Sequence, residues 1–100
     1  EPFDPRLGLY AAVTRGRPEG GPEGGWLPQE KITLEQALDL YTRGSARAER
    51  TERDKGTLLP GRWADCVVFA SDLFEAPPRD LLRIPVDLTI VGGHIVFERA

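Results

Sequence analysis

The chain has 100 residues, 40% of them hydrophobic and 29% charged, with a net charge of −3. This length allows one domain, or part of one, around a single modest core. The composition is typical of a folded protein rather than a disordered one. The charge offers no basic patch for nucleic acid, and no apolar run reaches the roughly 18 residues of a transmembrane helix. The single cysteine excludes an internal disulfide, so nothing indicates an oxidising compartment, and we expect a cytoplasmic protein.

The first predicted element is a short helix near the start of the chain. Asp4 stands where an N-cap accepts hydrogen bonds from the first turn, and Pro5 takes the first helical position, which tolerates proline. Residues with helical spacing follow: Leu7, Tyr10, Ala11 and Thr14. This pattern predicts a helix whose apolar face is formed by those four residues.

The segment from Gly16 to Glu30 carries five glycines and three prolines. Neither a helix nor a strand tolerates that density of breakers, so we predict a loop over residues 16–30. A loop of this length is either a flexible connection or a functional lid. In the second interpretation, Trp26 and Leu27 anchor the lid over a cavity.

A second helix is predicted after this loop. Thr33 and Gln36 have the spacing of a capping box, in which each side chain accepts a hydrogen bond from the other residue's backbone N–H. Four residues then line one helical face: Leu34, Ala37, Leu38 and Tyr41. We expect Gly44 to end the helix and Ser45 to cap a further turn or two. The charged run RAERTERDK that follows is typical of a solvated surface.

The stretch KGTLLPGRWAD contains Pro60-Gly61, a pair typical of a tight turn. The apolar run Cys66–Ala70 follows directly and predicts a strand buried on both faces, and therefore central in a sheet. The segment PPRDLL then predicts a single helical turn that begins at a proline, and Pro85 ends it.

The last segment, VDLTIVGGHIVFER, predicts a β-hairpin with Gly92-Gly93 as its two-residue turn. This turn pairs Val91 with His94 and Ile90 with Ile95, and it pairs Leu88 with Phe97 further on. One apolar face should then contain Val86, Leu88, Ile90, Ile95 and Phe97. The predicted fold class is therefore α+β, with N-terminal helices and a small antiparallel or mixed sheet that ends in a C-terminal hairpin.

No catalytic, cofactor-binding or metal-binding residue is predicted in this chain. His94 stands beside the hairpin turn and is expected to be exposed, and Cys66 is expected to be buried and inert. Ser45 and Ser71 lack a GxSxG context. Asp65 is expected to cap the backbone of the turn before the strand. A zinc site needs about three ligands, and the sequence shows no such cluster.

Several of these residues resemble the C-terminal signature of the amidohydrolase superfamily. In that superfamily a helix with T-x-x-x-A precedes G-x-L-x-x-G-x-x-A-D, an apolar strand and a final hairpin. The matching residues here are Thr42 to Ala46, then Gly56, Leu58, Gly61, Ala64 and Asp65, then Val91 to Val96. The segments DPRLGLYAAVTR and GGWLP also resemble the metal-dependent hydrolases that are similar to N-substituted formamide deformylases.

The resemblance implies a longer parent protein with a metal-bearing (β/α)₈ barrel and a small β-sandwich. Residues 1–50 would form the last helical edge of the barrel, with the loop 16–30, and residues 51–100 would form the C-terminal part of the sandwich. The parent would bind one or two divalent metal ions such as zinc, and this fragment would bind none. The last metal ligand, an aspartate, would lie just before Glu1. The lack of methionine and the opening EPFDPRL also suggest a piece of a longer protein.

The expected function is therefore a structural part of a metal-dependent amidohydrolase that hydrolyses a non-peptide C–N bond, and the fragment itself should be inactive. Its partners would be the remainder of the parent chain and a second copy bound through exposed strand edges, with no nucleic acid and no membrane. The alternative is a stand-alone binding module that uses the glycine-rich loop and Trp26 as its contact surface.

Overall fold

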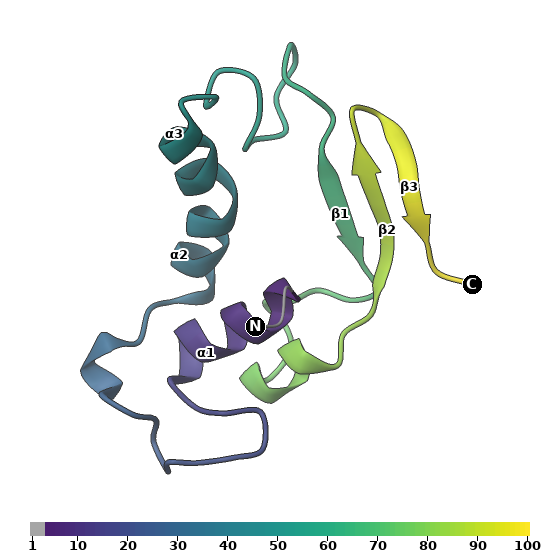
Figure 1. The fold of residues 1–100 in the computed structure, drawn as a ribbon. Coiled ribbons are helices and arrows are strands. Elements are labelled where there is room, and N and C mark those ends of the chain that lie inside the picture. The colour runs from purple at the N-terminus through teal and green to yellow at the C-terminus, as the bar shows by residue number, and fades with distance from the viewer. Residues whose placement is uncertain (1–3) are drawn as a thin grey trace. The chain divides into compact units, whose positions relative to one another are not determined.

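The computed structural model describes residues 4–100 (Figure 1). The chain forms two compact units: one joins the stretch up to Leu38 with Asp72–Ile84, and the other joins Asp39–Ser71 with Pro85–Ala100. The described residues contain three α-helical segments and a three-stranded antiparallel sheet. The α+β fold class predicted from the sequence is confirmed. No helix among residues 4–100 is long and apolar enough to span a membrane.

Helix α1, Pro5–Thr14, belongs to the first unit. Asp4 caps it as predicted, because its Oδ1 accepts a hydrogen bond from the Arg6 N–H at 3.0 Å. The predicted apolar face is only partly right: Leu7, Tyr10 and Thr14 are half-buried, but Ala11 is exposed. The buried residue of the helix is Leu9, which was not predicted on this face. Helix α1 contacts the 3-10 helix η3, Pro78–Leu82. Because η3 lies far along the chain, the side of α1 that it covers could not be inferred from the local sequence.

The core of the first unit is small and aliphatic. Its buried apolar side chains, each at most 7% exposed, come from α1, the second helix and the segment around η3: Leu9, Ala37, Leu73, Leu81 and Ile84. The helical turn predicted at PPRDLL forms as η3 and so places Leu81 in this core. The stretch 16–30 consists of turns as expected, except that a short 3-10 helix, η1, forms at Pro28–Glu30. The prediction of a loop over residues 16–30 therefore lacks this one helical turn, which begins at Pro28.

Helix α2, Leu34–Asp39, begins with the predicted capping box. The Thr33 N–H donates to Gln36 Oε1 at 2.9 Å, and the Gln36 N–H donates to Thr33 Oγ1 at 3.1 Å. The chain then continues without a break into the π-helix η2, Leu40–Gly44, and into α3, Ser45–Glu49.

The predicted helix end at Gly44 is wrong. Gly44 has ordinary helical angles, and Ser45 donates its hydroxyl to the carbonyl of Leu40 at 2.8 Å instead of capping a new turn. The helix ends at Arg50, whose φ of 65° is left-handed and whose N–H reaches the carbonyls of the last turn. A π-helical turn contains more residues than an α-helical one, so it shifts the phase of the helical face. Tyr41, predicted on the apolar face, is accordingly exposed.

The sheet belongs to the second unit and has the strand order β1-β2-β3, with β2 in the centre (Figure 1). The strands are β1, Cys66–Phe69, β2, Val86–Val91, and β3, His94–Glu98. Gly92 and Gly93 both have positive φ, 55° and 81°, as a type I′ hairpin turn requires. The predicted turn and the first two cross-strand pairs are confirmed.

Two predictions about the sheet are wrong. Strand β1 is not central but lies at one edge, and Val67 and Val68 are 47% and 41% exposed rather than buried on both faces. Phe97 pairs with Thr89 instead of Leu88, because Val96 is an extra residue in the ladder. This bulge moves Phe97 off the expected apolar face, and every residue of β3 is exposed.

Candidate functional site

Five of the residues that match the superfamily signature lie in the turn segment Gly56–Asp65, between α3 and β1. Gly56 has a φ of 98° and approaches the preceding helix closely. A Cβ at this position would lie 2.9 Å from the Cβ of Ala46, which is buried, and 3.2 Å from the Cα of Arg43. Both the angle and the space therefore require glycine here.

The Pro60-Gly61 pair forms the predicted tight turn. The Arg62 N–H donates to the carbonyl of Leu59 at 3.1 Å, and Gly61 has a φ of 86°, as the third residue of a type II turn requires. The Trp63 N–H then donates to the carbonyl of Asp54 at 2.7 Å. The turn segment is therefore folded back on the residues that directly precede it.

Charged side chains from the run RAERTERDK support this segment. The Lys55 ammonium lies 5.8 Å from the ring centroid of Trp63 and 2.9 Å from Oε2 of Glu49. A cation over a tryptophan ring is attracted by about 0.5–1 kcal/mol at an exposed site. Most of the run is exposed as predicted, but Lys55 is half-buried and contributes to the structure of the turn.

The end of the turn segment binds the tip of the hairpin, and we call this contact the hairpin clamp: Ala64 and Asp65 with Gly92 and Gly93. The Gly92 N–H donates to Asp65 Oδ1 at 2.8 Å, and the Gly93 N–H donates to the carbonyl of Ala64 at 2.9 Å. Asp65 is thus a structural cap, as expected, but it caps the hairpin turn and not the turn that precedes it. The tight turn in KGTLLPGRWAD therefore brings Asp65 to a partner 27 residues away.

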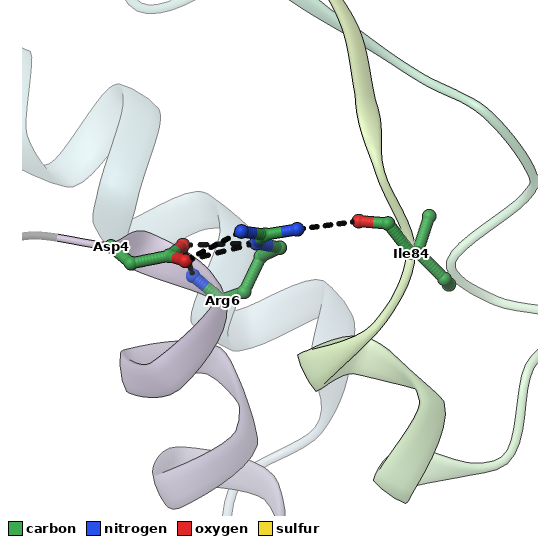
Figure 2. A network of polar contacts seen from close by, with 3 residues as sticks. All are labelled: Asp4, Arg6 and Ile84. Carbon is green, nitrogen blue, oxygen red and sulfur yellow. Dashed lines mark hydrogen bonds and ion pairs between the residues drawn. The ribbon is translucent and has the colours of Figure 1, made fainter.

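A polar network in the first unit joins the start of α1 to the end of the segment around η3 (Figure 2). The Arg6 guanidinium donates to both carboxylate oxygens of Asp4, at 2.7 Å to Oδ2, and to the carbonyl of Ile84 at 2.9 Å. Its hydrogen bonds lower the pKa of Asp4 below the ordinary value of 3.8, and the same pairing raises the pKa of Arg6. Arg6 was not singled out from the sequence, because its partner Ile84 is 78 residues away.

Trp26, considered as the anchor of a lid, is 62% exposed rather than buried. The backbone N–H of Trp26 donates to the backbone carbonyl of Arg15 at 2.9 Å. In return, the side-chain Nε of Arg15 donates to the backbone carbonyl of Trp26 at 3.0 Å. The Arg15 guanidinium also lies 5.4 Å from the centroid of the Trp26 ring. These contacts close the base of the glycine-rich loop and hold Trp26 at the surface.

The remaining residues with chemically reactive side chains are His94, Cys66, Ser45 and Ser71. His94 is exposed at the start of β3, as predicted, whereas Cys66 is half-buried rather than buried. Ser45 binds a helix carbonyl, and Ser71 is exposed. Among residues 4–100, no group of three or more His, Cys, Asp or Glu side chains could hold a metal ion. These residues therefore do not fit the divalent ions that the superfamily implies.

Comparison with known proteins identifies the family of this chain. The model of the amidohydrolase family matches residues 1–97. The chain therefore belongs to the amidohydrolase family.

Three relatives share this sequence over almost its whole length. YtcJ of Bacillus subtilis (strain 168), which is named as an amidohydrolase, is 33% identical over 102 residues, which cover 100% of this chain and 19% of that protein. The N-substituted formamide deformylase of Arthrobacter pascens is 28% identical, over 97% of this chain and 17% of that protein. The protein LONG AFTER FAR-RED 3 of Arabidopsis thaliana is 31% identical, over 95% of this chain and 16% of that protein. The chain thus spans less than a fifth of the length of these relatives, and no solved structure matches it significantly.

The hairpin clamp predicts the effect of replacing Asp65. Asp65→Ala should lower the free energy of unfolding by about 0.5–1.5 kcal/mol, because the Gly92 N–H loses its acceptor at a partly solvated position. Asp65→Asn should lose less, because the amide oxygen can still accept this bond. Urea unfolding followed by circular dichroism measures both changes. Asp54→Ala is the matched control, since it removes an exposed carboxylate. A control that is as unstable as Asp65→Ala would contradict the clamp.

The Asp4–Arg6 pair predicts a pH dependence of stability. Because the pKa of Asp4 is lower in the folded state than its ordinary value of 3.8, the carboxylate stabilises the fold above pH 3.8. This stabilising contribution is lost as the pH falls through the lowered pKa that Asp4 has in the folded state. The difference in unfolding free energy between the native chain and Asp4→Asn should therefore shrink in strongly acidic solution. Asparagine still caps the helix, so this variant isolates the effect of the charge.

Urea unfolding of the native chain and of Asp4→Asn, at neutral pH, near pH 5 and below pH 3.8, measures the difference in their unfolding free energies. Asp4 is 38% exposed, so solvent screening makes the effect modest. Asp54→Asn, at an exposed carboxylate, is the control. A difference that is constant across the whole range would show that the ion pair does not stabilise the folded state.

Proposed function

We propose that this chain is a structural part of a longer hydrolase that cleaves a non-peptide C–N bond of the amide type. In this reaction water adds to the carbonyl carbon, the C–N bond breaks, and an amine and a carboxylic acid are released. The observation that carries the proposal is the match of the amidohydrolase family over residues 1–97. The deformylase of Arthrobacter pascens, by its name, acts on N-substituted formamides, and that supports an amide-type substrate.

The chemistry itself would be performed by residues outside this chain. The described residues offer no metal-ligand cluster, so the one or two divalent ions expected for the longer protein, such as zinc, would be held elsewhere. Residues 1–50 would contribute the last helical edge of a (β/α)₈ barrel, and residues 51–100 the C-terminal part of a β-sandwich. The hairpin clamp and the Asp4–Arg6 network would stabilise these parts without contacting the substrate.

An activity assay on two proteins tests this proposal. The longer protein encoded by the same gene should release amine and formate from N-substituted formamides, whereas the 100-residue chain alone should release neither and should contain no stoichiometric zinc. Liquid chromatography of the products and elemental analysis give the two readouts. The longer protein should be tested on formamides, larger amides and ureas. Failure on all of them, or activity of the isolated chain, would contradict the proposal.

A further inference from the structure

The tip of the glycine-rich loop, residues 17–24, makes few contacts of its own. Every residue of the tip is exposed. Within residues 4–100, its hydrogen bonds go to other residues of the loop: the Arg17 N–H donates to the carbonyl of Gly21 at 3.2 Å, and the Gly20 N–H donates to the carbonyl of Arg17 at 2.9 Å. Segments with so few contacts open more readily than packed helices. The order of the tip therefore depends on the base of the loop.

The base of the loop is closed mainly by two residues, Arg15 at the end of α1 and Trp26. Each donates a hydrogen bond to the backbone carbonyl of the other, at 3.0 and 2.9 Å, and the Arg15 guanidinium lies 5.4 Å from the centroid of the Trp26 ring. The indole is 62% exposed, so water competes for these contacts. We infer that residues 16–31 form a flap that opens and closes as one unit, and that the contact between Arg15 and Trp26 is its latch.

The closed flap contains unusual backbone angles at its latch. Arg15 and Leu27 have positive φ values of 56° and 51°. Residues with a Cβ seldom adopt this left-handed region, and such conformations persist only where the surrounding contacts hold them. Breaking the latch removes contacts that hold both residues in place. The latch therefore offsets a backbone cost that favours opening.

Closure also requires a glycine at position 25. A Cβ on Gly25 would lie 2.2 Å from the carbonyl oxygen of Thr14 and 3.0 Å from the Cβ of Arg15. Gly24 has a similar positive φ, 75° against 89°, but a Cβ there would meet no atom within 4 Å. The two neighbouring glycines thus separate the effect of space from the effect of backbone angle. Only Gly25 is needed for the close approach of the two ends of the loop.

Hydrogen bonds that do not involve the latch set the limits of the flap. On one side, the Arg15 N–H donates to the carbonyl of Ala11 at 2.8 Å and completes α1. On the other, the Ile32 N–H donates to the carbonyl of Ala12 at 3.1 Å. Between Trp26 and Ile32, the bonds of η1 are local, such as that from the Glu30 N–H to the carbonyl of Leu27. Opening of residues 16–31 therefore leaves α1 and α2 folded.

Hydrogen exchange followed by mass spectrometry tests the latch in the longer protein. Arg15→Met removes the charge and the side-chain donor, so peptides that cover residues 16–31 should exchange about tenfold faster than in the native protein. Peptides of α1 should stay within about threefold of their native rates. Arg15→Lys should lie between the two, because it keeps a cation near the ring but loses the planar guanidinium.

Arg17→Met is the matched control, since it removes an exposed arginine from the tip of the same loop. Equal exchange in the native protein and Arg15→Met would overturn the inference. An equal acceleration in both arginine variants, or an acceleration that extends to α1, would do so as well.

The glycine pair gives a second readout, again in the longer protein. A protease specific for glutamate can cut the open flap after Glu19 or Glu23, and mass spectrometry identifies these cuts. Gly25→Ala should raise the rate of cleavage at these sites about tenfold, because the added methyl group blocks closure. Gly24→Ala should raise it clearly less, since only its backbone angle is unfavourable. Equal rates in the two variants would contradict the close approach at Gly25.

The competing possibility is that another part of the longer protein holds the tip. If residues 17–24 stay protected from exchange in Arg15→Met, the latch does not control the flap and the inference is wrong. None of these measurements uses the amide-hydrolysis assay. The latch can therefore fail while the proposed function stands, and the proposed function can fail while the latch stands.

Discussion

The arrangement of the second unit depends on the hairpin clamp. Gly92 and Gly93 adopt a turn with two positive φ angles, and their N–H groups point outward to Asp65 and to the carbonyl of Ala64. These two bonds connect the start of β1 to the tip of the β2-β3 hairpin, and so they set the register in which β1 pairs with β2. Two signature residues that precede Asp65 shape the turn segment without touching the hairpin clamp. Gly56 allows the segment to pack closely against α3, and Gly61 allows the tight turn that reverses the chain direction.

Features determined by neighbouring residues were predictable from the sequence. The Thr33–Gln36 capping box, the Asp4 cap and the Gly92-Gly93 turn all rest on residues at most three positions apart, and all three are confirmed. Strand bounds in the hairpin were also predicted, since the glycine turn fixes where the two strands begin to pair.

Features determined by distant partners were not predictable in the same way. The buried face of α1 depends on η3, and the partners of Asp65 and Arg6 lie 27 and 78 residues away. Extra residues within a helix or a strand were not predicted either. The π-helical turn Leu40–Gly44 continues the helix past Gly44, and the extra residue Val96 in β3 pairs Phe97 with Thr89 instead of Leu88. The central position predicted for β1 failed because these residues provide only one neighbouring strand. For the candidate site, the sequence indicated the structural role of Asp65 but not the hairpin tip that it binds.

Amide hydrogen exchange at the hairpin turn, resolved by NMR, tests the clamp most directly. If the Gly92 and Gly93 N–H groups are bonded as described, both should exchange at least about tenfold more slowly than in an unstructured peptide. In Asp65→Ala the protection of Gly92 should fall, while the central pairs of β2 with β3 should keep theirs. Unprotected exchange at Gly92 and Gly93 in the native chain, beside a protected β2, would show that the hairpin forms without the clamp and would contradict this account.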